Sequence, residues 1–294
     1  ADPTYPFLPV SSIVGAALLL LVLTVNFVRQ SYNLGVSFLC FWLFWELSAT
    51  GINTILWSDN ADLKLYVYCD IVSHLFMITY AAKPACTLLI SRRLYKVVSS
   101  RSVLLPSRKE VISSDYIVQD ARFLVEEGFG CIDTAKSSWL TMILIYSWPI
   151  IFSSISVLFY CPKVVYVFYR RSRDIDHFFQ SSSSVSRPNY LRLLVLASLD
   201  IILTLPIAIA SFVDQLSSPS PGYSIPLYTG WKLTHSDWTP ISLSYSDLET
   251  DDGRGWTFTV YYLNHWSSVV LALVIFSLFG LTADARTTYR RAFY

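Results

Sequence analysis

Ionisable side chains inside long apolar stretches are the feature of this sequence with the clearest chemical meaning. Five such residues are candidates for a functional role: Asp70, His74, Lys83, Asp200 and His265. A charge in the hydrocarbon core of a bilayer is costly, so such residues usually pair with one another or line a polar cavity. They indicate ion pairs or a binding site within a membrane.

Lys83 and Asp200 are predicted to lie at the same depth. Lys83 is nine residues before Arg92, and Asp200 is eight after Arg192, which places both roughly 12–14 Å from the cytoplasmic ends of their helices. An ion pair between them would relieve two desolvation costs and could hold an inactive state. The alternative is that each snorkels or bonds to a backbone carbonyl.

Two histidines and several aromatic residues are candidates for ligand binding. Counted from the outer ends, His74 and His265 are each about two and a half helical turns deep, and Trp266 follows His265. They could line a pocket, or they could form polar contacts between helices. Tyr228 and Trp231 belong to a long acidic loop, which could meet a basic peptide or remain a solvated loop.

Catalytic and metal chemistry is not indicated. Neither an HExxH nor a GxSxG motif is present, and the cysteines show no CxxC or Cys/His spacing typical of a metal site. The two histidines within apolar stretches have no acidic partner at ligand spacing. We therefore expect no enzyme, no metal site and no cofactor.

Composition points to a membrane protein. Of 294 residues, 53% are hydrophobic and 15% charged, and the mean hydropathy is +0.46, whereas about a quarter of a soluble domain is charged. The net charge of +1 excludes a broadly basic nucleic-acid-binding protein. We expect an all-α, polytopic transmembrane helix bundle, a multi-pass protein whose partner is the lipid bilayer of the plasma membrane.

Six apolar spans can be counted in a single receptor-like domain, 1–294. They cover about 7–28, 34–57, 65–90, 139–168, 193–213 and 256–281, with a long extracellular loop at 214–256. Short basic flanks mark the cytoplasmic side. The residues concerned are Arg92 and Arg93 after the third span, and Arg170, Arg171 and Arg173 after the next.

These flanks conflict with a count of six. Both spans must run from outside to inside, so the stretch 96–137 between them has to cross outwards. No window there approaches about 17 apolar residues, and we predict an irregular segment. Either a poorly apolar segment crosses the membrane, or the sequence lacks one helix.

Several motifs occur in the order found in a known family. They are DPTYP at the start, YCDIVSH (68–74), KPACTLLISRRLY (83–95), YIVQDARFLVEEGFGC (116–131) and FGLTADARTTYRRAF (279–293). Over nearly its whole length the chain resembles the STE3-type mating pheromone receptors of basidiomycete fungi, which are class D G-protein-coupled receptors. In that family an apolar fourth helix precedes the part resembling YIVQDARF, and here it is missing.

The resemblance implies a function and several residue roles. It implies seven helices, a farnesylated peptide pheromone as ligand, and a heterotrimeric G protein that signals to a MAP-kinase cascade. It places Cys69 and Cys131 at the extracellular face, where they could form a disulfide, and gives the five flanking arginines a second role in G-protein contact. A transporter would instead need paired half-repeats, which are not seen. A non-signalling receptor remnant remains the other reading, because of the missing helix.

Overall fold

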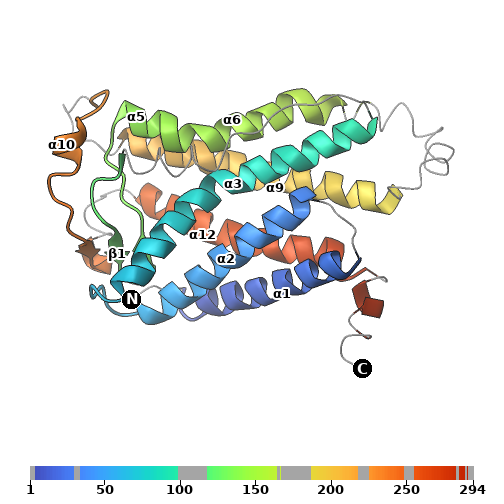
Figure 1. Ribbon diagram of the computed structural model, residues 1–294, viewed down its shortest axis with the longest axis horizontal. Helices are drawn as coiled ribbons and strands as arrows, with labels where there is room; N and C mark the ends of the chain where they lie inside the picture. The colour runs from blue at the N-terminus through green and yellow to red at the C-terminus, as the bar shows by residue number, and fades with distance from the viewer. Residues whose placement is uncertain are drawn as a thin grey trace.

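Six long helices lie side by side along the longest axis of the computed structural model (Figure 1). It describes residues 4–29, 34–98, 118–163, 166, 187–217, 225–247, 255–282, 285–288 and 290. The helices are α1 (Phe7–Arg29), α2 (Leu34–Leu56), α3 (Tyr66–Val98), the continuous run α5 (Trp139–Thr141), η1 (Met142–Tyr146), α6 (Ser147–Ile155) and η2 (Ser156–Tyr160), then α9 (Arg187–Ser217), and α12 (Gly255–Ile275) with η3 (Phe276–Gly280).

Five of the six helices are long and apolar enough to cross a membrane: Phe7–Phe27, Leu34–Leu56, Trp139–Lys163, Tyr190–Leu216 and Thr259–Gly280. The other is α3, which carries Asp70, Lys83 and the arginines near its end. It packs against α2, α6 and α9, so its polar residues can be covered by protein instead of lipid. The chain is therefore an all-α transmembrane bundle.

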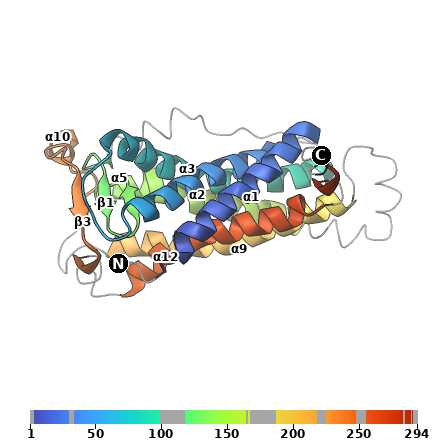
Figure 2. The same cartoon turned by 90° about the horizontal axis from the view of Figure 1, so that it is seen from below.

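The described helices alternate in direction along the chain except at α3 and α5–η2, which follow one another and run the same way. α1, α3, α5–η2 and α12 run away from the end that carries the strands, and α2 and α9 run back towards it (Figures 1 and 2). Arg92 and Arg93 lie in the last turns of the outgoing helix α3, and Arg286 follows η3. By the positive-inside preference, the end with the strands faces outside.

The expected loss of a fourth helix falls on 99–117, outside the described residues. The described residues on either side lie at opposite ends of the bundle: α3 ends at Val98 on the inner side, and the chain is next described at Val118 on the outer side. The part of the predicted irregular stretch that is described, 118–137, holds two strands.

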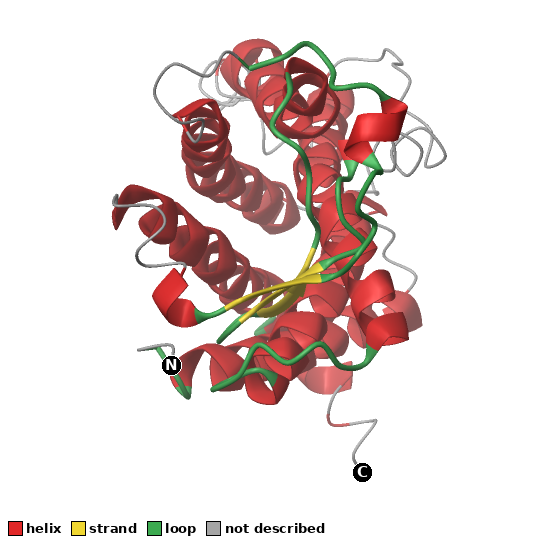
Figure 3. Ribbon diagram, turned by 90° about the vertical axis from the view of Figure 1, so that its left-hand side faces the viewer, coloured by secondary structure: helices red, strands yellow, loops and turns green. Residues whose placement is uncertain are grey.

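A small sheet covers the outer end of the bundle (Figure 3). β1 (Leu124–Glu126) and β2 (Gly130–Ile132) form an antiparallel hairpin, and β3 (Ile241–Leu243) pairs with β1 in parallel, in the order β2-β1-β3. β3 belongs to the segment that the sequence predicted only as a long loop. The sheet therefore joins two outer segments that are far apart in the chain.

The buried side chains form two clusters. The larger one lies between α1, α2, α3, α9 and α12, and includes Leu39, Leu43, Leu196 and Ala272. The smaller one lies under the sheet and contains Trp57, Cys69, Phe123, Val125 and Cys131. Many apolar side chains face outwards instead, as expected of helices whose outer surface is solvated by lipid.

Candidate ligand cavity

The hairpin is fixed to α2 and α3 by a disulfide and by hydrogen bonds. Cys69 at the start of α3 is bonded to Cys131 in β2. The Asn53 side-chain amide donates to the Cys131 carbonyl at 3.1 Å, and the Tyr68 hydroxyl donates to Asn53 Oδ1 at 2.9 Å. The Gly128 N–H donates to the Trp57 carbonyl at 2.6 Å. The sheet is therefore held firmly over the helix ends.

Gly130 lets the hairpin approach α2 this closely. Its φ is +82°, a conformation that side-chain-bearing residues rarely adopt. A Cβ atom at this position would lie 2.7 Å from Asn53 Cβ and 2.9 Å from a ring carbon of Trp57. Both backbone conformation and space therefore require glycine here.

An ion pair adds a further attachment. Arg122, just before β1, donates two hydrogen bonds to the Asp70 carboxylate, at 2.9 and 2.7 Å. The hydrogen bond to Asp70 raises the pKa of the Arg122 guanidinium, so Arg122 remains charged. Both side chains are more than 30% exposed, and the pair orients the hairpin more than it stabilises it.

The last outer segment is tied to the same hairpin. The Ile241 N–H donates to the Phe123 carbonyl at 3.1 Å, and the Glu127 N–H donates to the Leu243 carbonyl at 3.0 Å. The Tyr245 N–H donates to the Glu127 carboxylate at 2.9 Å. We call these three strands and their attachments the roof.

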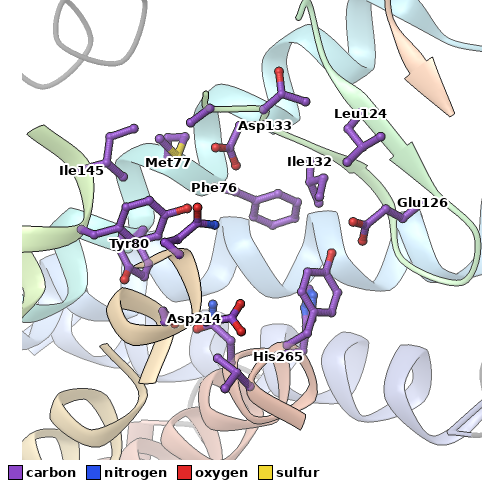
Figure 4. A pocket seen from close by; sticks show the side chains of 18 of the residues that line it. Phe76, Met77, Tyr80, Leu124, Glu126, Ile132, Asp133, Ile145, Asp214 and His265 are labelled. Carbon is purple, nitrogen blue, oxygen red and sulfur yellow. The ribbon is translucent and has the colours of Figure 1, made fainter. Parts of the chain in front are cut away.

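A cavity of about 490 Å³ lies beneath the roof, in the outer half of the bundle (Figure 4). Its walls come from α3, from the hairpin and the segment after it, from η1, and from α9 and α12. The aromatic residues in its lining are Phe76, Tyr80, Tyr146 and Tyr261, and the carboxylates are Glu46, Asp120, Glu126, Asp133 and Asp214. Lys83 is the only Lys or Arg among the described lining residues.

Lys83 and Glu46 form an ion pair where both line the cavity. Lys83 Nζ lies 2.9 Å from Glu46 Oε1, and their side chains are only 9% and 13% exposed. Lys83 also donates to Ser268 Oγ at 3.0 Å, and Ser268 donates to Glu46 Oε1 at 2.7 Å. This group, which we call the polar hub, joins α2, α3 and α12.

The sequence predicted a Lys83–Asp200 ion pair, but the structure gives Lys83 the carboxylate of Glu46 as its hydrogen-bonded partner. Asp200 is fully buried and accepts a hydrogen bond from Thr87, one turn nearer the inner end of α3 than Lys83. Depth along a helix fixes the level of a side chain but not the neighbour it faces. Lys83 lies about one helical turn nearer the outer end than the Thr87–Asp200 contact. It faces Glu46, which is the only charged residue of α2.

Comparisons with known proteins fit this architecture. A family model described as STE3, pheromone A receptor, matches residues 7–115 and 110–294. The chain belongs to this family. The two matched segments meet within the stretch that was expected to lack a helix.

Individual relatives are pheromone receptors of fungi. The pheromone B alpha 2 receptor of Schizophyllum commune is 29% identical over 99% of this chain and 46% of its own length. Pheromone receptor 1 of Ustilago hordei is 25% identical over 94% of this chain and 80% of its own. The pheromone a factor receptor of Saccharomyces cerevisiae is 24% identical over 96% and 61%. The chain spans about half the length of the Schizophyllum receptors it matches.

Family and fold together give the location of the protein. A member of this receptor family with several membrane-spanning helices is a multi-pass protein of the plasma membrane. The matched relatives carry the names of receptors, not of enzymes.

The structure brings only one of the five predicted ligand residues to the cavity. His265 lines it and stacks on Phe129, with ring centroids 5.4 Å apart. His74 Nδ1 lies 2.7 Å from the carbonyl of Asp70 in its own helix, and Trp266 packs against the larger core. Trp231, the first residue of α10 (Trp231–Thr234), is half exposed and stacks on His235. Tyr228, in the same outer segment, is not among the lining residues.

The predicted G-protein residues are described only in part. Arg92 and Arg93 lie near the inner end of α3. Arg170, Arg171 and Arg173 lie outside the described residues.

Several cavity residues were missed by the sequence analysis. Glu46 carried a usable signal, because it is a lone charge in an apolar span. Asp214 directly follows a predicted span and Asp133 lies in the stretch predicted to be irregular, and acidic residues are common at such positions and carry no signal. Tyr80 and Tyr146 were not distinguishable from the many aromatic residues that face lipid.

Proposed function

We propose that this chain is the membrane-spanning part of a G-protein-coupled receptor for a lipidated, farnesylated peptide pheromone. Ligand binding at the outer cavity shifts the packing of the helices, and the inner end then activates a heterotrimeric G protein that feeds a MAP-kinase cascade. A ligand drives such a shift only if it binds one arrangement of the helices better than the other.

The observation that carries this proposal is the roofed cavity in a chain of the pheromone receptor family. Side chains from α3, α9 and α12 all line the cavity. The polar hub connects α3 and α12 to α2. A ligand in the cavity therefore contacts several helices at once. The relative positions of these helices determine the shape of the inner surface that the G protein would bind.

The inner end suits a protein partner with acidic residues. Arg92 and Arg93 lie near the inner end of α3. The partly described segment after η3 adds Arg286 and Arg290. These residues serve membrane topology as well. We assign the G-protein contact to this basic surface, together with the arginines that follow η2 in the sequence.

The test is expression in a fungal host that lacks its own pheromone receptor and carries a reporter driven by the mating MAP kinase. Synthetic S-farnesyl peptide methyl esters are applied to cells that display the chain at their surface. We expect dose-dependent reporter induction that is lost in Tyr80→Ala and retained in the lipid-facing control Ile202→Ala. Normal surface display without a response to any peptide would contradict signalling by this chain.

A non-signalling receptor is the second candidate, and the divided family match around residues 110–115 favours it. The two are separated by measuring peptide binding and nucleotide exchange on the G protein in the same membranes. Binding without exchange would identify a receptor that has kept its cavity and lost its coupling.

A further inference from the structure

We propose that the cavity binds a positively charged group of the ligand, an ammonium or a guanidinium, and excludes the lipid chain. The inference rests on the proposed function, because it names the part of the peptide that enters the site. The ligand is thereby oriented, with its charged peptide portion under the roof and its lipid portion in the bilayer.

The sign of the lining charges is the first argument. Five carboxylates line the cavity against one ammonium, that of Lys83. In Figure 4 the carboxylates of Glu126, Asp133 and Asp214 point into the space from three sides, from the roof, from the segment after it and from α9. A cleft lined by one sign of charge with low-dielectric walls concentrates ions of the opposite sign.

The polar hub supplies the second argument. Glu46 Oε1 accepts hydrogen bonds from Lys83 and Ser268, whereas Glu46 Oε2 is buried and has no hydrogen-bond partner among the described residues. A buried carboxylate oxygen without a partner is energetically costly. Because Glu46 also lines the cavity, a donor bound there would satisfy this oxygen once the Glu46 side chain rotates towards the cavity.

The aromatic walls are the third argument. Phe76, Tyr80, Tyr146 and Tyr261 line the same space as the carboxylates. Aromatic faces attract ammonium and guanidinium groups through the ring quadrupole, and the attraction grows when the cation is desolvated. Carboxylates combined with aromatic rings therefore suit a cation. An anion would be repelled by the carboxylates, and a long alkyl chain would offer them no hydrogen bond.

Apolar side chains such as Met77, Ile145 and Val260 also line the cavity, but the carboxylates among them make it a poor site for an isoprenoid chain. Such a chain would remove water from several carboxylates without offering them a hydrogen bond, which opposes binding strongly. The bilayer, by contrast, solvates such a chain at no electrostatic cost. The charge of the lining therefore favours the peptide portion of the ligand in the cavity and its lipid portion in the membrane.

A ligand-independent experiment tests the sign of the cavity. A reporter cysteine is introduced by Ala135→Cys, at a lining position, in a Cys161→Ser background, since Cys40 and Cys86 are buried and Cys69–Cys131 is a disulfide. Its reaction rates with methanethiosulfonates carrying trimethylammonium or sulfonate are compared. The matched control is Ser236→Cys on the exposed outer segment.

We expect the cationic reagent to be favoured at position 135 by about tenfold or more over the ratio at position 236. The preference should fall severalfold in Asp133→Asn/Asp214→Asn and in high salt. Equal ratios at positions 135 and 236 would overturn the proposal, and this result does not depend on signalling or on the folding of the neutralised variant.

The second measurement uses an S-farnesyl peptide methyl ester that activates the chain. It is compared with its N-acetylated form and with forms in which lysine is replaced by norleucine or arginine by citrulline. We expect one of these changes to lower potency about tenfold or more, which also shows whether the terminal amine or a side chain enters. Equal potency of all forms would refute the cation site and leave the receptor function standing. If no peptide activates the chain, the receptor function fails and the reagent ratio still decides the charge of the cavity.

Discussion

Lys83 on α3 and Glu46 on α2 are joined by a 2.9 Å ion pair at the lining of the cavity, and Ser268 on α12 hydrogen-bonds to both. Three helices that are distant in the chain thus share one buried polar contact. Removing one member leaves the other charge buried without its partner, which costs more than the pair itself contributes.

The variant Lys83→Met should therefore be strongly destabilised. We expect a loss of about 3–5 kcal/mol in the free energy of unfolding, measured by denaturant unfolding of the purified protein in detergent. The double variant Lys83→Met/Glu46→Leu should recover most of this loss, because no charge remains buried. The control is Ser267→Ala, whose hydroxyl donates only to the Asn264 carbonyl of its own helix. A double variant as unstable as Lys83→Met would disprove this account.

Replacing Gly130 should impair folding far more than replacing another glycine of similar backbone conformation. Gly230 has φ +85° and nothing within 4 Å of an added Cβ, whereas at Gly130 the added atom meets Asn53 and Trp57. Gly230→Ala should cost roughly 1–2 kcal/mol from backbone strain alone. Gly130→Ala should cost several times more, visible as reduced surface display of a tagged chain. Comparable display of the two variants would show that the hairpin can move away from α2.

Loss of the disulfide should loosen the roof. The bond closes a loop of 62 residues between Cys69 and Cys131, and removing such a bond typically costs about 2–4 kcal/mol. We expect Cys131→Ser to lower the thermal midpoint and to increase hydrogen exchange in β1 and β2. Cys161→Ser, which removes a free thiol, serves as the control and should leave both unchanged. A roof with unaltered exchange in Cys131→Ser would mean that Asn53 and Arg122 suffice to hold it.

A reporter fused after Tyr294 should lie in the cytoplasm. α12 starts at the roofed end and runs to the opposite one, where the arginines lie. A dual reporter fused after Tyr294, glycosylated outside and active only inside, should remain unglycosylated and active. A second fusion placed in the outer segment at residue 236 is the matched control and should be glycosylated. A glycosylated tail would mean that the second half of the chain is inverted.

The all-α transmembrane class was predictable from the sequence, because apolar length acts locally along the chain. The partner of Lys83 was not, since it depends on the rotation of α2 and α3 about their axes, which depth does not fix. Sequence reasoning also missed the roof. Strands of three residues such as Ile241–Leu243 are too short to show an alternating pattern, and their pairing with Leu124–Glu126 spans more than a hundred residues.

The residues of the cavity were likewise predictable only in part. Ionisable residues were recognised where they interrupt apolar spans, as with His265 and Lys83. Asp133 and Asp214 could not be recognised, because the first follows a three-residue strand, the second lies in the last turn of α9, and they become part of a site only when the bundle brings them together. The acidic character of the site is a property of the assembled fold.

The parallel pairing of β3 with β1 divides the segment between α9 and α12 into two independent lengths of chain. Residues on either side of Ile241–Leu243 can change in number and composition while the strand stays paired with β1. Under the proposed function, changes that alter ligand selectivity can therefore accumulate in these two lengths separately, while β3 keeps its place beside β1.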